Sequence, residues 1–323
     1  VSKYEIQKTK EPLTDVWNSN LFMEKYGLDV RFCDALGGWH IWDGSRWERD
    51  TSFKILRLAK NTVRQMFDLA KVTSDKDLFK HAVKSETEAK LMGMINLSKS
   101  EGVSLTSDKF DTDNFLLNCK NGTVDLMTGE LKPHDRSDYL TKIIEFNYNP
   151  NAQYPAWQKF LNSIFLNDQE LIKFMQKAVG YSLSGSTKEQ CIFILYGTGS
   201  NGKSTFLKHI YHILGDYAIN TPATTLMEKY NDSSSNDIAR LKGARFVTSI
   251  ETGKNKHLAE SQIKQLTGDD PISARFLFKE YFEFFATFKI FFATNHKPKI
   301  TGTDSGIWRR ILTIPFDKVI SAQ

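Results

Sequence analysis

Cys191-Ile-Phe-Ile-Leu-Tyr-Gly-Thr-Gly-Ser-Asn-Gly-Lys-Ser-Thr205 predicts a strand, a loop and the start of a helix in immediate succession. Its apolar run, Cys191–Tyr196, is typical of a buried strand in a parallel sheet. The segment Gly197–Ser204 matches the pattern G-x-x-x-x-G-K-[ST]. Apolar residues at helical spacing follow and stop at Gly215, a residue that commonly ends helices. The order of these parts predicts an α/β domain with a phosphate-binding loop.

The predicted loop brings backbone N–H groups and one lysine to the phosphates of a nucleoside triphosphate. Lys203 would reach the β- and γ-phosphates, and the Ser204 hydroxyl would be a ligand of Mg²⁺. The predicted nucleotide-binding residues are Gly197, Thr198, Gly199, Ser200, Asn201, Gly202, Lys203, Ser204 and Thr205.

Composition is that of a globular protein with room for two domains. The chain has 323 residues, of which 40% are hydrophobic and 25% charged, and it shows no run of eighteen apolar residues that would predict a membrane span. Three widely spaced cysteines predict neither disulfides nor a zinc site, which favours a reducing, cytoplasmic setting. The net charge of +5 is compatible with a nucleic-acid partner. Because the sequence begins with Val1, we expect a piece of a longer protein.

The N-terminal half predicts a small α+β module. Asp43-Gly44 between alternating aromatic residues predicts a hairpin over Trp39–Trp47. Its three tryptophans either pack one face of a small sheet or form a platform on which bases stack. Helical spacing predicts a helix over 53–70 and a charged, solvent-facing helix over 77–97, and turn signals predict a short meander around 123–127. One or two further helices are expected over 157–183.

Four polar residues after the phosphate loop suit ATP hydrolysis. Glu251 ends the predicted strand 245–251, and Asn295 ends the predicted strand 289–295. Ligands of open α/β sheets bind where strands end, so Glu251 would activate water and Asn295 would hold that water and the γ-phosphate. Arg309 and Arg310 precede a last strand, and either could supply positive charge to a neighbouring subunit's transition state.

These motifs together resemble the superfamily 3 helicases, and among them the phage/plasmid and poxvirus-type primase–helicases. The resemblance rests on the phosphate loop, the acid-ended and Asn-ended strands, Lys264–Asp269 (Lys-Gln-Leu-Thr-Gly-Asp) and Trp308-Arg-Arg before Ile314-Pro-Phe. It extends upstream through Asn121-Gly-Thr-Val-Asp125, Tyr139-Leu-Thr141, Trp157 and Gly180–Gly185.

The resemblance implies an AAA+-type ATPase that uses ATP and Mg²⁺, assembles as a hexameric ring and unwinds replicating DNA of a phage, plasmid or mobile element. It implies three parts: an α+β N-terminal domain over 1–150, a helical collar over 151–190 and the helicase domain over 191–323. It also implies a DNA-binding hairpin over 271–285, with Lys279 near its tip and Arg275 on the preceding strand. Such residues would grip single-stranded DNA through its phosphates.

The sequence departs from the pattern at one functional position and leaves two other functions open. A lone acid, Glu251, ends its strand where many such ATPases have two, so either Glu251 serves both metal and water or Mg²⁺ relies on Ser204 and water. No primase core is recognisable, which leaves a separate primase domain or protein as an expected partner. A phosphotransferase acting on a small molecule, or an ATP-dependent DNA-binding platform that does not unwind, would also carry a phosphate loop.

Overall fold

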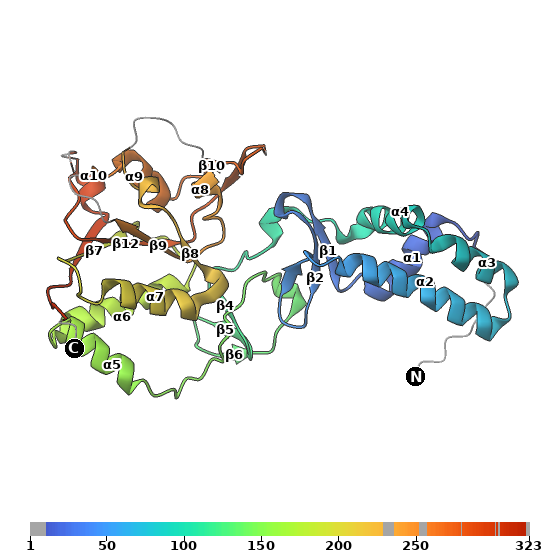
Figure 1. Cartoon of the computed structure of the whole chain (residues 1–323), viewed down its shortest axis with the longest axis horizontal. Coiled ribbons are helices and arrows are strands. Elements are labelled where there is room, and N and C mark those ends of the chain that lie inside the picture. Colours follow the sequence, from blue (N-terminus) through green and yellow to red (C-terminus); the bar gives the residue numbers. More distant parts are fainter. Residues whose placement is uncertain are drawn as a thin grey trace. The chain divides into compact units, whose positions relative to one another are not determined.

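A computed structural model describes residues 11–228, 236–251, 257–278, 280–300, 302 and 304–320. These residues divide into two compact units (Figure 1). The first unit extends to Thr112 and takes in Asp135–Thr141, and the second holds Asp113–His134 and the chain from Lys142 onward. The segment 113–134 therefore packs with the phosphate-loop unit. The functional domain limits at residues 150 and 190 stay a prediction.

The first unit combines four helices with a three-stranded antiparallel sheet. Its elements are α1 (Asp15–Tyr26), β1 (Val30–Cys33), β2 (Gly38–Trp42), β3 (Trp47–Arg49), α2 (Lys54–Thr73), α3 (Lys76–Ser85) and α4 (Glu88–Ser98). The predicted hairpin is confirmed, since Trp42 pairs with Trp47 across β2 and β3. Trp39 and Trp47 are buried, and Trp47 Nε1 donates to the carbonyl of Arg136 at 2.8 Å. Buried rings cannot stack on bases, so these two tryptophans are core residues.

The predicted single helix over 77–97 is wrong in two respects. The chain breaks into α3 and α4 because Thr87 between them is extended, with φ −69° and ψ 149°. The helix α4 also faces solvent on one side only, because Leu91, Met94 and Ile95 are buried in the core of this unit. In addition, α1 was missed, since its mixture of polar and aromatic residues carries little helical periodicity.

The second unit is built on the parallel sheet that the sequence predicts. Its strands are β7 (Ile192–Tyr196), β8 (Ala218–Asn220), β9 (Phe246–Glu251), β12 (Lys289–Thr294) and β13 (Ile311–Pro315), in the order β13-β7-β12-β9-β8. All four pairings are parallel. Apolar side chains leave both faces: Phe193, Leu195 and Phe291 enter one core cluster, and Ile194 and Phe292 another. Burial on both faces explains the unbroken apolar runs of β7 and β12.

Helices cover both faces of the sheet (Figure 1). The first core cluster includes residues of α5 (Pro155–Ile164), α6 (Gln169–Leu183) and α7 (Lys203–Leu214), and the second includes residues of α8 (Asn236–Ala239), α9 (Glu260–Thr267) and α10 (Ser305–Trp308). Two smaller sheets complete the unit: β4 (Leu116–Cys119), β5 (Gly122–Asp125) and β6 (Leu131–Lys132), and the pair β10 (Ile272–Ala274) and β11 (Phe282–Phe284). The mixed α/β class with a parallel sheet is thus confirmed, whereas a collar role for α5 and α6 stays a prediction.

Two buried cations at the start of the sheet bind backbone carbonyls of the segment 183–186, which precedes β7. Lys289 is 2% exposed, and its ammonium donates to the carbonyls of Ser184 and, at 3.1 Å, Ser186. Arg245 is 4% exposed and donates to the carbonyl of Leu183 at 2.6 Å. Carbonyl acceptors satisfy the donors but do not neutralise the charges. Burial, helped by the neighbouring Arg245, lowers the pKa of Lys289 to about 7.

We expect this lysine to make the free energy of unfolding rise as the pH increases above about 7. The pKa of Lys289 is about 7 in the folded chain against 10.5 ordinarily, so between these values the unfolded chain binds more protons, and stability increases with pH. Below pH 7 both states are protonated and the penalty is constant. Urea unfolding at pH 7.0 and 8.5 should show a gain of about 1.6 kcal/mol, against about 2 kcal/mol if the limiting slope of about 1.4 kcal/mol per pH unit held over the whole interval. Lys289→Met should lose that gain, and a Lys188→Met control at an exposed lysine should keep it.

The three cysteines are buried: Cys33 is 1% exposed, Cys119 4% and Cys191 7%. Burial raises the pKa of Cys119 to about 11, and burial with nearby Glu189 does the same for Cys191. No disulfide joins them. None of the helices in the described part of the chain combines the length and the apolar character that crossing a bilayer requires.

Candidate nucleotide-binding site

The loop between β7 and α7 has the backbone of a phosphate cradle. Gly197, Gly199 and Gly202 have φ of 157°, 109° and 87°, and Ser200 has φ 47°. Positive φ at these points turns successive N–H groups toward one side, as anion-binding nests require. The N-cap of α7 is Gly202, which has no side chain with which to cap the first N–H groups of the helix. Those N–H groups at a positive helix end suit the oxygens of a phosphate.

Lys203 lies inside this loop. Its side chain is 5% exposed, and its ammonium donates to Gly197 O at 2.6 Å and Asn201 Oδ1 at 3.0 Å. Both acceptors are neutral oxygens, and burial lowers the pKa of this ammonium. A buried cation held only by neutral oxygens gains more from a phosphate oxygen than an exposed lysine would. The residues therefore fit a bound polyphosphate.

The loop is closed against the end of β13. Asn201 is buried, and its Nδ2 donates to Phe316 O at 2.8 Å. A Cβ atom at Gly197 would come within 2.2 Å of Asn201 Nδ2 and 2.3 Å of Phe316 O. Only glycine fits at Gly197, because the loop backbone passes so close to β13. The loop, β7 and β13 thus form one packed assembly.

Sheet register brings the acid and the amide predicted for catalysis to the same edge as the loop. Thr294 pairs with Tyr196 on one side and with Glu251 on the other. Glu251 therefore ends β9 level with the end of β7, and Asn295 follows β12 between them. Two strand spacings separate β7 from β9, about 10 Å. A γ-phosphate and one water fit into such a span, so the predicted grouping of loop, Asn295 and Glu251 agrees with the strand order.

Exposure at this edge differs between the two predicted metal ligands. Glu251 is 6% exposed, whereas Ser204 and Thr205 are exposed on the first turn of α7. Within the described residues, no cluster of three His, Cys, Asp or Glu could hold a metal ion. Ser204 and Glu251 could still contribute to Mg²⁺, which takes many of its ligands from phosphates and water.

Arg309 and Arg310 lie at the opposite edge of the sheet. The carbonyl of Arg310 accepts from the N–H of Ile192, the first residue of β7, at 2.8 Å. The phosphate loop leaves the other end of that five-residue strand, about 16 Å away at 3.3 Å per residue. An arginine side chain does not extend so far. Neither arginine can therefore reach a nucleotide held by the phosphate loop of its own chain.

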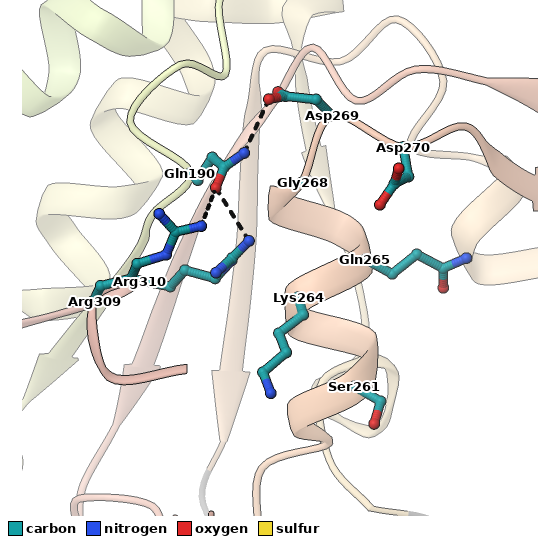
Figure 2. A pocket seen from close by; sticks show the side chains of 9 residues that line it. All are labelled: Gln190, Ser261, Lys264, Gln265, Gly268, Asp269, Asp270, Arg309 and Arg310. Carbon is teal, nitrogen blue, oxygen red and sulfur yellow. Dashed lines mark hydrogen bonds between the residues drawn. The ribbon is translucent and has the colours of Figure 1, made fainter. Parts of the chain in front are cut away.

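A cavity of about 570 Å³ lies beside the arginines (Figure 2). Its lining includes Gln190, Lys264, Asp269, Arg309 and Arg310. Gln190 stands between the two guanidinium groups and Asp269, and hydrogen bonds join it to all three (Figure 2). Sequence reasoning missed Gln190, because one glutamine two residues before a strand carries no signal of its own. Its partners lie 79 to 120 residues away along the chain.

The predicted DNA-binding hairpin is present as the pair β10 and β11, with Ile272 opposite Phe284. Arg275 was predicted on the strand but lies just after Ala274, where β10 ends, and its guanidinium stands over the ring of Tyr281 at 4.7 Å. Phe278 is 95% exposed in the connecting segment. Lys279 lies outside the described residues. A DNA-binding role for Arg275 and Lys279 stays a prediction.

Two family models match the chain. The model described as "D5 N terminal like" matches residues 19–166. A second model, a family of unknown function designated DUF5906, matches residues 195–310. The second match covers the phosphate loop, Glu251, Asn295 and both arginines.

Viral proteins with provisional helicase or primase names are among the relatives. A protein of Acanthamoeba polyphaga mimivirus, provisionally named a helicase, is 25% identical over 92% of this chain and 34% of its own length. A protein of Invertebrate iridescent virus 3 with the same provisional name is 25% identical over 67% of this chain and 24% of its own length. A protein of African swine fever virus, provisionally named a primase, is 26% identical over 62% of this chain and 22% of its own length. The chain thus spans about a third or less of these relatives.

Among solved structures, the C-terminal region of NrS-1 aligns with a TM-score of 0.45 and 16% sequence identity. The alignment covers 55% of this chain and 41% of that one.

Proposed function

We propose that this chain, which belongs to the D5-type primase–helicase family, is an ATP-driven DNA helicase of the superfamily 3, AAA+ type. It would hydrolyse ATP with Mg²⁺ at interfaces between subunits of a ring, with a hexamer as the expected state, and unwind DNA during replication of a virus, phage, plasmid or mobile element. A primase domain or protein is its expected partner.

The observation that carries this proposal is the separation of the site into two edges of one sheet. The phosphate loop, Asn295 and Glu251 gather where β7, β12 and β9 end, and the arginines lie where β7 and β13 begin. If Arg309 or Arg310 contributes charge to a transition state, the nucleotide must then be bound by another copy of the chain. A ring in which each subunit offers its arginine edge to the next subunit's phosphate loop satisfies this geometry.

Each residue at the loop edge has a role that fits its position. Bound Mg²⁺ would supply positive charge across the β- and γ-phosphates, with Ser204 among its ligands. Lys203 would bind the same phosphates from inside the loop. Glu251 would accept a proton from the attacking water, and Asn295 would orient that water toward the γ-phosphorus. Among the described residues, the strand register places the carboxylate of Glu251 at this edge. Of the two roles left open for it, we assign activation of the attacking water before binding of Mg²⁺.

A small-molecule phosphotransferase fits the geometry less well. Such an enzyme needs a pocket for its acceptor beside the phosphate loop, and it has no use for the pair of arginines that Gln190 holds at the opposite edge. An ATP-dependent DNA-binding platform would share every feature of the site, and it differs from a helicase in strand displacement alone.

Steady-state ATP hydrolysis with and without single-stranded DNA tests the proposal. We expect DNA to raise the turnover several-fold, and turnover per subunit to rise with protein concentration as subunits share sites. A fork substrate in the same reactions should be unwound. Stimulation without unwinding would indicate the platform instead. An ATP turnover that depends on neither DNA nor protein concentration would contradict a ring motor.

A further inference from the structure

The two arginines at the cavity differ in what holds them. Arg310 is 9% exposed, and its guanidinium donates to Thr267 Oγ1 at 3.2 Å, Gly306 O at 2.6 Å and Gln190 Oε1 at 3.1 Å. Burial, and then the neighbouring charge of Arg309, lower the pKa of Arg310. Three acceptors from three directions fix this group in place. Arg310 is therefore an anchor that cannot leave the surface without breaking all three hydrogen bonds.

Arg309 is exposed, and its Nη2 donates to Gln190 Oε1 at 2.8 Å. Two guanidinium groups thus meet at one neutral oxygen, which satisfies a donor of each and neutralises neither. Asp269 and Asp304 offset part of the positive charge at Arg310, and a phosphate oxygen fits the fork of the exposed Arg309 guanidinium.

Gln190 is itself held from the other side. Its Nε2 donates to Asp269 Oδ2 at 2.9 Å, so the amide nitrogen faces the carboxylate and the amide oxygen faces the arginines. The backbone of Gln190 has φ 47°, and its N–H donates to Thr187 O at 2.8 Å. A side chain fixed at its amide and at its backbone can hold a flexible arginine in one orientation.

We propose that Gln190 is the positioning residue of Arg309, the exposed member of the arginine pair expected to serve a nucleotide bound by a second copy of this chain. The inference rests on the proposed function, because it needs a site shared between two copies. Gln190 acts through Arg309 and does not itself touch the nucleotide. A neutral amide suits this role, since a carboxylate would form a stronger, charge-assisted hydrogen bond and hold Arg309 back.

Mixed assemblies test this directly. Chains with Lys203→Ala do not hydrolyse their own nucleotide but still offer their arginine edge to a wild-type neighbour. We would mix wild-type chain with an excess of Lys203→Ala chain, and compare partners that also carry Gln190→Leu, Gln190→Glu, Arg309→Ala, Arg310→Ala or Gln265→Leu. The readout is ATP turnover per wild-type subunit in the presence of single-stranded DNA. Gln265 is the matched control, an exposed glutamine that lines the same cavity and points away from the arginines (Figure 2).

We expect partners with Arg309→Ala to lower the neighbour's turnover by about 10³-fold, and those with either Gln190 change to lower it about tenfold to a hundredfold. Partners with Gln265→Leu should give the same turnover per wild-type subunit as partners that carry Lys203→Ala alone. Gln190→Glu is isosteric, so a loss with this variant at unchanged thermal stability separates positioning from folding.

Three results would overturn the inference. If Arg309→Ala lowers the turnover and both Gln190 changes leave it intact, Gln190 does not position the arginine, and the shared site stands. If Arg310→Ala is costly and Arg309→Ala is not, the two arginines have the opposite roles. If no arginine change in the partner matters, the shared site is absent and the proposed function fails with it.

Discussion

The Lys203→Ala chain should lose ATP hydrolysis by about 10²–10³-fold, the usual effect of removing one preorganised charge from a transition state. Lys203 is buried in the loop, where its attraction for phosphate oxygens is less screened than at an exposed site. ATP binding should weaken as well, because the same ammonium contacts the ground-state phosphates. A coupled assay of phosphate release and a titration with a fluorescent ATP analogue would measure the two effects separately.

The matched control is Lys208→Ala, an exposed lysine on the same helix α7. It should keep both turnover and affinity. The substitution at Lys203 leaves Gly197 O and Asn201 Oδ1 without their donor, so thermal unfolding must be recorded for each variant. Wild-type hydrolysis by a folded Lys203→Ala chain would show that this loop does not bind the reacting nucleotide.

The Glu251→Gln chain should bind ATP normally and hydrolyse it about 10²–10⁴-fold more slowly, the range for loss of a general base. The amide has the shape of the carboxylate but cannot accept the proton of the attacking water. Because Glu251 lies about 10 Å from β7 across β12, it would act through a water and not on the phosphates. Single-turnover hydrolysis at saturating ATP isolates this step, with the equilibrium affinity measured alongside.

Glu145→Gln, at an exposed glutamate of the same unit, serves as the control and should change neither quantity. If the Glu251→Gln chain hydrolyses ATP at the wild-type rate, another group must be the general base. Weakened ATP binding with normal single-turnover hydrolysis would instead make Glu251 a ligand of the nucleotide or its metal.

Sequence alone predicted those elements whose signal is local. The runs that became β7 and β12 are apolar on both faces and end in Tyr196 and Thr294, so a buried parallel strand was the natural interpretation. The spacing of the glycines in the loop likewise predicted a phosphate-binding turn without reference to the rest of the fold. The first helix, α1, was missed because tertiary burial of Trp17 and Phe22 stabilises it more than periodicity does.

What the sequence could not predict depends on the neighbours that the fold creates. Strand order β13-β7-β12-β9-β8 is a tertiary property, and that order separates the arginines from the loop of their own chain. The role proposed for Gln190 depends on its hydrogen bonds with Asp269, Arg309 and Arg310. In the same way, Lys289 looks like an ordinary strand-leading lysine until its burial among the carbonyls of Ser184 and Ser186 is seen.

Burial of the three cysteines makes the chain a ready background for site-directed fluorescent labelling. A thiol with a pKa of about 11, as at Cys119 and Cys191, presents only about 0.03% thiolate at pH 7.5, and the thiolate is the form that reacts with maleimides. Cys33 is shielded by the core around it. A dye could therefore be attached to one cysteine introduced at Phe278, which is 95% exposed, without removing any native cysteine. Energy transfer from that dye to labelled DNA would follow the hairpin during turnover.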